Sequence, residues 1–191
     1  MRLPRLLILT DRSLCTGPLQ DTVATAVQCG SRAVVLREKD LSTTERARLA
    51  TELAAVLEPV GGVLVVAGPL GDAVHLSSQD TFPEPRPPLV GRSCHSSDEV
   101  VRAGVEGCDY VTVSPVFTTP SKPGYGPALG MEQLAVLAAL GPPVYALGGV
   151  QPPDVPACLE AGARGVAVMG TVMREPQIVA AYLSALQEGP R

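Results

Sequence analysis

Short apolar runs alternate with longer amphipathic segments along most of the chain. The short runs are rich in Val, Leu and Ile and lack a clean alternation of apolar and polar positions, which is typical of parallel strands covered by helices. We expect eight such strands, over residues 6–10, 33–36, 62–66, 73–76, 89–93, 110–115, 144–147 and 165–169. The amphipathic segments predict helices over residues 19–29, 43–57, 97–104, 131–140, 152–161 and 176–187.

Several of these segments carry helix start and stop signals. Ser96 comes just before Ser-Asp-Glu, which suits an N-cap followed by acidic residues in the first turn. Pro152 or Pro153 fits a first helical position. Gly104 and Gly162 suit helix ends, because glycine adopts the left-handed backbone conformation there without strain.

Two connections are unable to hold an ordinary helix. Residues 68–72 are too few, and residues 81–88 read TFPEPRPP, which is too rich in proline. The pattern therefore predicts a (β/α)8 TIM-type barrel, in one domain over residues 1–191, that lacks helices after its third and fourth strands. The length of 191 residues agrees with such trimming, since barrels of this type usually need about 250. An open doubly wound sheet is the alternative fold.

Charge and composition exclude several partners. The chain has 15 basic and 19 acidic residues, no Trp and two Phe, and so offers neither a basic stripe nor a stacking surface for nucleic acid. No apolar stretch approaches the length of a membrane span, and the run at 6–9 is too short for a signal peptide. Five isolated Cys and two His complete no zinc pattern, so we expect reduced structural thiols in a cytoplasmic protein.

The clearest chemical signal is a pair of glycine-rich strand ends. Gly148 and Gly149 follow the seventh predicted strand, and Met169 and Gly170 follow the eighth. In barrels of this type the loops after strands seven and eight commonly bind phosphate, because glycine lets backbone N–H groups approach the anion. We therefore predict a phosphate site here, with a simple tight turn as the alternative.

The segment after the sixth strand adds hydroxyl groups and a cation. Thr118, Thr119, Ser121 and Lys122 lie within five residues, ahead of a stretch rich in Gly and Pro. Hydroxyls and an ammonium suit a phosphate or a leaving diphosphate, and the flanking residues suggest a lid. A solvated turn is the alternative.

Two cations end the second strand. Arg37 and Lys39 alternate along the chain, so both are expected to point to the same side and to suit a polyanion. The alternative is a rim in which they form salt bridges with Glu38 and Asp40.

Polar residues also follow strands four and five. Asp80 is a candidate Mg²⁺ ligand, because hard cations prefer carboxylate oxygens. Ser93 and His95 end a strand, which favours a place in a site, although no third group marks them as a nucleophile and its base. His75 and His95 are candidate acid–base groups, and a hydrogen-bonded core position is the alternative for His75.

Seven segments, in order along the chain, resemble motifs of the thiamine phosphate synthase family and its thiazole tautomerase (TenI) branch. They read LILTD, LREK, VHLSSQD, GRSCH, DYVTVSPVFTTPSK, ALGGV and GVAVMG, between residue 6 and about residue 173. The resemblance implies a transferase of thiamine biosynthesis that joins a pyrimidine diphosphate to thiazole phosphate, releases pyrophosphate and uses Mg²⁺. It also implies a homodimer.

The resemblance assigns roles to the candidate residues. It implies Ser93, Lys122 and Arg37 as catalytic residues and Asp80 as the metal ligand. It implies that the remaining candidates bind the phosphate or diphosphate, and these are Lys39, Thr119, Ser121, Gly148, Gly149, Met169 and Gly170.

The chain departs from the synthase pattern at three places. Val35 stands where synthases have Gln, Ser77-Ser78 stands for Gly-Gln, and Ala67-Gly68-Pro69 replaces the Asn-Asp that holds the second Mg²⁺ ligand. The tautomerase branch needs no Mg²⁺, but its proton-transferring His would fall at Pro115. A synthase is therefore our first prediction. A TenI-like tautomerase or inactive relative is the second, and a non-catalytic phosphate-binding protein is the third.

Overall fold

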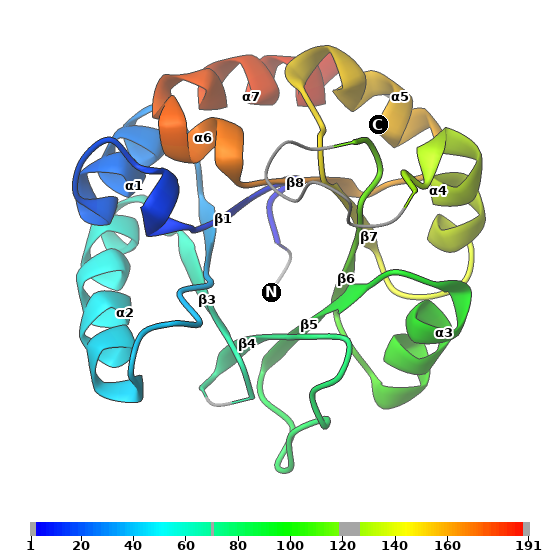
Figure 1. Cartoon of the computed structure of the whole chain (residues 1–191), viewed down its shortest axis with the longest axis horizontal. Helices are drawn as coiled ribbons and strands as arrows, with labels where there is room; N and C mark the ends of the chain where they lie inside the picture. Colours follow the sequence, from blue (N-terminus) through cyan, green and yellow to red (C-terminus); the bar gives the residue numbers. More distant parts are fainter. Residues whose placement is uncertain (1–2, 70, 119–126, 189–191) are drawn as a thin grey trace.

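The eight predicted strands close into a parallel barrel (Figure 1). The computed structural model describes residues 3–69, 71–118 and 127–188. Each strand pairs with the next, and the last returns to the first through pairs such as Leu7 with Ala167, so the open-sheet alternative is wrong. The strands are β1 Leu6–Leu9, β2 Ala33–Leu36, β3 Val63–Ala67, β4 Ala73–Leu76, β5 Leu89–Cys94, β6 Tyr110–Val113, β7 Val144–Leu147 and β8 Gly165–Val168.

Helices cover most of the outer surface of the barrel. They are α1 Leu19–Gln28, α2 Thr43–Leu57, α3 Ser97–Glu106, α4 Gly130–Ala138, α5 Val155–Glu160, α6 Gly170–Arg174 and α7 Val179–Glu188. Short 3₁₀ turns add η1 Arg12–Leu14, η2 Glu58–Val60, η3 Pro152–Asp154 and η4 Pro176–Ile178. None of the helices in the described part of the chain is long and apolar enough to cross a membrane.

The helices differ from the sequence prediction at several of their ends and by one additional helix. α3 continues past Gly104 to Glu106, because Gly107 is the residue with the left-handed backbone (φ 83°) that ends it. The segments predicted at 152–161 and 176–187 each begin with a 3₁₀ turn that has proline among its first residues. α6 was not predicted, because five residues are too few for an amphipathic pattern.

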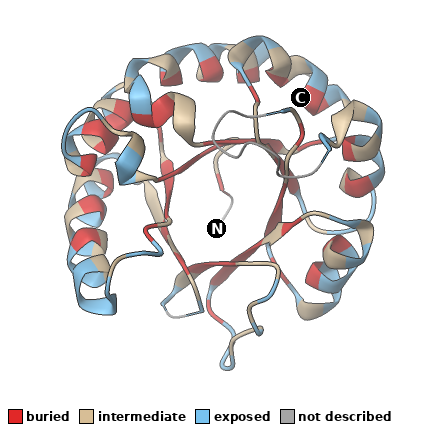
Figure 2. Ribbon diagram, viewed as in Figure 1, coloured by how far each residue is buried: buried red, intermediate tan, exposed pale blue. Residues whose placement is uncertain are grey.

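Strand residues alternate between the barrel interior and the helix layer. Apolar side chains occupy both faces, so most strand positions are buried (Figure 2), and this explains why the strands lack an apolar–polar alternation. The cluster inside the barrel consists of Leu3, Leu7, Leu9, Ala33, Val35, Val65, Leu89, Tyr110, Tyr145 and Ala167. The larger cluster joins the outer strand faces to the helices.

A buried arginine occupies the region of the missing helices. Within the described residues, no helix lies between β3 and β4 or between β4 and β5, as predicted. Arg92 points outward from β5, and its Nη1 donates to the carbonyls of Ser77 (2.9 Å) and Asp80 (2.8 Å). Its Nη2 pairs with Glu106 Oε2 at 2.7 Å. The guanidinium thus satisfies loop carbonyls beside the barrel wall where a helix would otherwise pack.

We expect Arg92→Met to lower the free energy of unfolding by about 3 kcal/mol, because it breaks a buried ion pair and leaves two carbonyls without their donor. Urea unfolding measures this loss. The matched control is Arg102→Met, since Arg102 pairs with the same Glu106 from a half-exposed position and should contribute less than about 1 kcal/mol. Equal losses in the two variants would contradict this role for Arg92.

Candidate active site

A cavity of about 280 Å³ opens at the carboxyl ends of β2, β6, β7 and β8. This is the end of the barrel at which enzymes of this fold place their active sites. The residues that line it are Leu9, Arg37, Ser114, Pro115, Thr118, Leu147, Gly148, Gly149, Val150, Gln151, Ala167, Val168, Met169, Gly170, Thr171 and Arg174. All four residues predicted at the glycine-rich strand ends are among them.

The two glycines after β7 allow a close approach between backbones. Both have positive φ, 93° at Gly148 and 71° at Gly149, and a Cβ on Gly149 would lie 2.6 Å from the Thr118 carbonyl oxygen. The approach is fixed by hydrogen bonds from Val116 N–H to Leu147 O and from Phe117 N–H to Gly148 O, both 2.9 Å. The tight turn that was the alternative reading is therefore present, and it forms a wall of the cavity.

Three polar residues of this cavity were missed by the sequence prediction. Arg174 lies at the end of α6, where its Nη1 donates to Gly170 O at 3.3 Å, and Gln151 donates to Thr171 Oγ1 at 3.4 Å. One signal was available, because Arg174 follows Gly170 by four residues and so falls on the same side of a helix.

The acidic neighbours of Arg37 and Lys39 pair with a different arginine. Nη1 of Arg12, in η1, lies 3.0 Å from Glu38 Oε2, and its Nη2 lies 2.5 Å from Asp40 Oδ2. Hydrogen bonding to Arg12 holds the pKa of the Asp40 carboxyl below its usual value. A salt-bridged rim is therefore present, but its cation is Arg12 and not Arg37 or Lys39 as the alternative had it.

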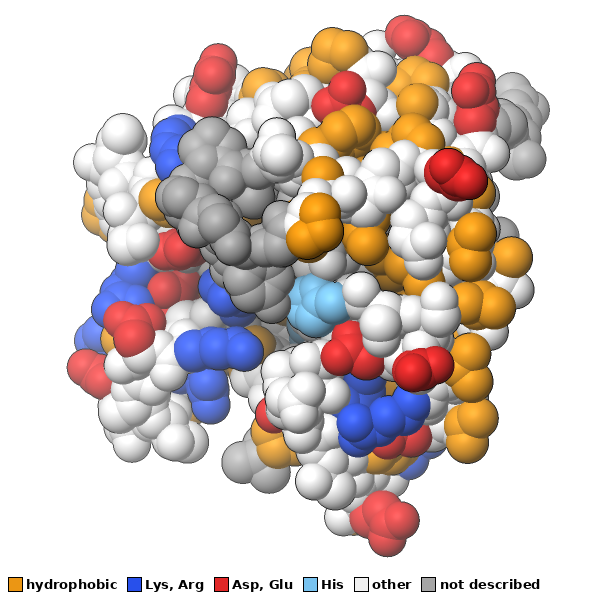
Figure 3. Space-filling model, turned by 45° about the vertical axis from the view of Figure 1, so that its right-hand side comes forward, with side chains coloured by type: hydrophobic (Ala, Val, Ile, Leu, Met, Phe, Trp, Pro, Cys, Tyr) orange, Lys and Arg blue, Asp and Glu red, His pale blue; other side chains and the backbone are white. Residues whose placement is uncertain are grey.

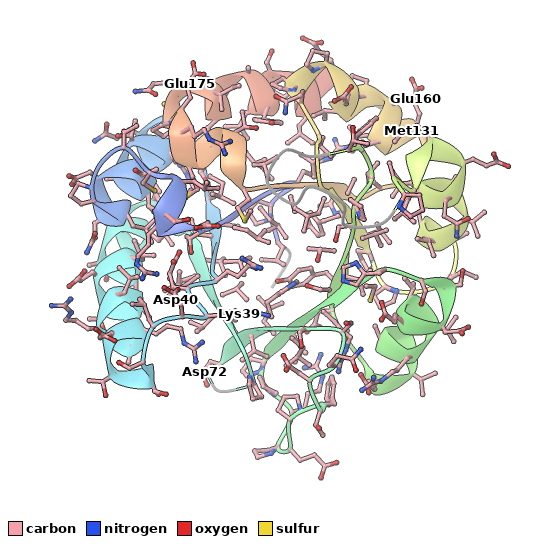
Figure 4. All side chains as sticks on the ribbon, viewed as in Figure 1. Lys39, Asp40, Asp72, Met131, Glu160 and Glu175 are labelled. Carbon is pink, nitrogen blue, oxygen red and sulfur yellow. The ribbon has the colours of Figure 1, made fainter. Side chains whose placement is uncertain are left out.

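Arg37 and Lys39 consequently face the barrel opening without a salt bridge to any residue in the described part of the chain. The backbone N–H of Arg37 donates to Thr10 Oγ1 at 3.0 Å, which fixes the end of β2, and the Arg37 side chain lines the cavity. Figure 4 shows Lys39 toward the centre of the barrel and Asp40 farther out, beside α2. The two cations thus lie on the barrel side, as their alternation predicts.

His75 and Ser93 meet inside the barrel on neighbouring strands. His75 Nε2 lies 2.9 Å from Ser93 Oγ, and His75 Nδ1 lies 3.0 Å from the hydroxyl of Tyr110. Burial, and to a smaller extent the positive charges of Lys39 and Arg37, lowers the pKa of His75 to about 3. His75 is therefore a neutral, hydrogen-bonded imidazole at physiological pH.

Asp80 lies on the side of the Pro-rich loop. It borders a second hollow, lined also by Phe82 and Pro85, and not the cavity at β7 and β8. Its Oδ2 accepts a hydrogen bond from the backbone N–H of Ser77 at 2.6 Å. Across the described ranges, no three His, Cys, Asp or Glu side chains form a group that could hold a metal ion.

His95 lies on the rim after β5. Its Nδ1 donates to the carbonyl of Ser114 at 2.7 Å, and its backbone N–H donates to Glu99. His95 does not border the cavity, although Ser114 does. Thr119, Ser121 and Lys122 lie outside the described residues.

The structure is thus a closed parallel barrel with glycine-rich strand ends and two cations at the carboxyl rim of its strands, and comparison with known proteins gives its family. The profile of the thiamine monophosphate synthase family matches residues 6–172. This chain belongs to that family.

Known relatives cover nearly the whole chain. The thiamine-phosphate synthase of Methanoregula boonei is 33% identical over 191 residues, which cover 92% of this chain and 88% of the relative. The thiamine-phosphate synthase of Methanoculleus marisnigri is 34% identical, with 94% and 92% covered. Among solved structures, the thiamine phosphate pyrophosphorylase of Pyrococcus furiosus superposes with a TM-score of 0.83 at 25% identity and covers 96% of both chains.

The lowered pKa of His75 predicts how stability depends on pH. The unfolded chain binds a proton on His75 below about pH 6.5, whereas the folded chain does not until about pH 3. The contribution of neutral His75 to the free energy of unfolding is therefore fully present above pH 6.5 and is lost as the pH falls toward 3. Between pH 7 and pH 5 we expect the wild type to lose about 2 kcal/mol more than His75→Gln. Urea unfolding at both pH values measures the difference, and parallel losses would contradict a neutral buried His75.

Proposed function

We propose that this chain is a thiamine phosphate synthase, which joins a pyrimidine diphosphate to thiazole phosphate and releases pyrophosphate. Family membership and synthases at 33–34% identity support this activity. The observation that carries the proposal is the cavity itself. It brings the glycine-rich ends of β7 and β8 into one cavity with Arg37 of β2, so one rim can hold two anionic groups.

In this reaction the thiazole nitrogen forms a bond to the methylene carbon of the pyrimidine. The bond from that carbon to the diphosphate oxygen breaks, and the diphosphate leaves with the electron pair. The main catalytic demand is to stabilise the charge that develops on the leaving group. Arg37 and Lys39 would supply positive charge to the diphosphate, together with Ser93 and the predicted segment of Thr119, Ser121 and Lys122.

The thiazole phosphate would lie at the other side of the cavity. Gly149 and Gly170 end adjacent strands there, and their backbones can approach a phosphate closely. Arg174 and Thr171 border the same space and would add a cation and a hydroxyl. This arrangement would separate the phosphate that stays on the product from the diphosphate that leaves.

The sequence predicts Mg²⁺ as the cofactor, and the described donor groups do not fit a site for it. Asp80 offers one carboxylate, one oxygen of which already accepts the Ser77 N–H. The position of the second carboxylate of synthases is taken by Ala67-Gly68-Pro69, and Arg37 and Lys39 bring positive charge to this rim.

The weak donor set is also the observation that favours the second candidate, a TenI-like tautomerase or inactive relative, since that branch needs no metal. Against catalysis of that kind, Pro115 occupies the position of the proton-transferring His, and His75 is held neutral inside the barrel. The synthase remains the function that the cavity supports best, because two anion-binding regions suit two phosphorylated substrates.

We further propose one barrel domain over residues 1–191 that works as a homodimer in the cytoplasm. Val101 and Val105 of α3 and Val136 of α4 are exposed on adjacent helices, and Figure 3 shows hydrophobic side chains over the right-hand face of the molecule. Such surfaces favour association, which light scattering tests. All five cysteines are free, which suits a reducing compartment.

The direct test is an assay with thiazole phosphate, pyrimidine diphosphate and Mg²⁺, in which thiamine phosphate is followed by fluorescence after oxidation. We expect product from the wild type and a rate lower by about 100-fold in Arg37→Met, because a charge contact to the leaving group is lost. Arg32→Met is the control for the loss of a cation, because Arg32 lies just before β2 and donates hydrogen bonds to the carbonyls of Val27 and Ser31. No product above background from the wild type would overturn the synthase assignment.

Asp80→Asn separates a structural role from a metal-binding one. Asparagine keeps an oxygen that can accept the Ser77 N–H, but it lacks the charge that Mg²⁺ prefers. We expect the Mg²⁺ concentration for half-maximal activity to change by less than about twofold, because the observed role of Asp80 is to accept that hydrogen bond. A rise of tenfold or more would show that Asp80 is a metal ligand, and would contradict a role limited to its hydrogen bond with Ser77.

A further inference from the structure

A line of hydrogen-bonded polar side chains crosses the apolar interior of the barrel. The Tyr110 hydroxyl lies 3.0 Å from His75 Nδ1, and His75 Nε2 lies 2.9 Å from Ser93 Oγ. Tyr110 and His75 are 1% and 5% exposed, whereas Ser93 at the end of β5 is only half-buried. The line therefore leads from a fully buried phenol to a hydroxyl near the barrel mouth.

The barrel is shaped to hold this line. The Tyr110 ring packs against Gly91 of β5, where a Cβ would lie only 2.1 Å from the ring, so a larger residue at this position would displace the phenol. The ring also packs edge-on against Tyr145, with 5.6 Å between centroids. The glycine of the GRSCH motif, Gly91, is thus explained by the position of Tyr110.

The direction of the hydrogen bonds follows from the proton of the phenol. Burial raises the pKa of Tyr110 far above its usual value, so the phenol keeps its proton. Its hydroxyl makes no hydrogen bond to a described residue other than His75. A buried O–H without an acceptor is strongly unfavourable, and Tyr110 must therefore donate to His75 Nδ1.

The state of His75 then follows from that of Tyr110. A neutral imidazole has one donor and one acceptor nitrogen. Because Nδ1 accepts from Tyr110, the proton is on Nε2, which donates to Ser93 Oγ. Thr112 Oγ1 also lies near Nε2, but at 3.5 Å it is the weaker partner. The reverse direction would leave the Tyr110 proton buried without an acceptor.

We propose that Tyr110 and His75 are positioning residues that make Ser93 a hydrogen-bond donor toward an anionic phosphate oxygen at the barrel mouth. Since Nε2 of His75 already carries a proton, His75 cannot remove the proton of Ser93, and the two do not act as a nucleophile and its base. Ser93 instead accepts a hydrogen bond from His75 Nε2, and its own hydroxyl hydrogen is left to donate to a ligand. The catalytic consequence rests on the proposed function, whereas the direction of the hydrogen bonds does not.

The direction is tested by ¹⁵N NMR of the full chain with labelled histidine, with the His75 signals assigned by their loss in His75→Gln. We expect the wild type to show a protonated Nε2 and an unprotonated Nδ1 for His75 at pH 7. In Tyr110→Phe this preference should be lost, because Nδ1 no longer has a donor. A His75 protonated on Nδ1 in the wild type would overturn the proposal, even if Tyr110→Phe fails to fold.

Kinetics test the consequence for Ser93. In Tyr110→Phe we expect kcat for pyrophosphate release to fall about tenfold with KM changed less than twofold, because a donor to the leaving group becomes misdirected. Tyr145→Phe is the matched control, as its buried hydroxyl donates to Pro4 O at 2.8 Å, away from His75, and it should leave both the NMR signals and kcat unchanged.

A full kcat in Tyr110→Phe, together with a changed His75 tautomer, would refute the positioning role. If the wild type makes no thiamine phosphate, the proposed function fails. The NMR result and the binding of inorganic pyrophosphate to wild type and Tyr110→Phe then decide the present proposal, which expects at least threefold weaker binding in the variant and is contradicted by equal affinities.

Discussion

Arg12 pairs with both carboxylates of the segment that follows β2. Glu38 and Asp40 alternate with Arg37 and Lys39 along that segment, so acids and bases compete at short distance for partners. By holding both acids on the outer side, Arg12 leaves the two cations facing the barrel. The proposed binding of a diphosphate at this rim depends on that separation of charge, because cations already neutralised by Glu38 and Asp40 would attract a diphosphate weakly.

Other buried polar side chains stabilise the side of the barrel where the described chain has no helices between β3 and β5. Arg92 binds loop carbonyls where two helices are missing, which keeps β4 and β5 in place. These two strands in turn carry His75 and Ser93 into the interior. The buried Arg92 on the outer face of the barrel and the hydrogen-bonded line inside it therefore support the same two strands. These strands lie across the barrel from the glycine-rich ends of β7 and β8.

Features that depend on local sequence pattern could be predicted from the sequence. Every strand lies within two residues of its predicted bounds, and Gly148, Gly149 and Gly170 border the cavity as expected. The alternative, in which Glu38 pairs with Arg37 or Lys39, named the wrong cation, because Arg12 lies 26 residues away along the chain and only pairing of β1 with β2 brings it near. The role of Arg92 and the direction of the His75 hydrogen bonds likewise depend on tertiary contacts that no sequence spacing reveals. α6 and Arg174 were missed because a five-residue helix leaves almost no periodic signal.

If Arg12 keeps Arg37 and Lys39 available to an anion, the loss of Arg12 should weaken anion binding at a site that Arg12 itself does not line. Isothermal titration of inorganic pyrophosphate into the wild type and Arg12→Gln tests this most directly, with Arg48→Gln as a control for the loss of another rim cation near Arg12. We predict that Arg12→Gln weakens pyrophosphate binding at least tenfold, because Glu38 and Asp40 become free to pair with Arg37 and Lys39. Arg48→Gln should change it less than twofold. An affinity in Arg12→Gln equal to that of the wild type or of Arg48→Gln would contradict the account.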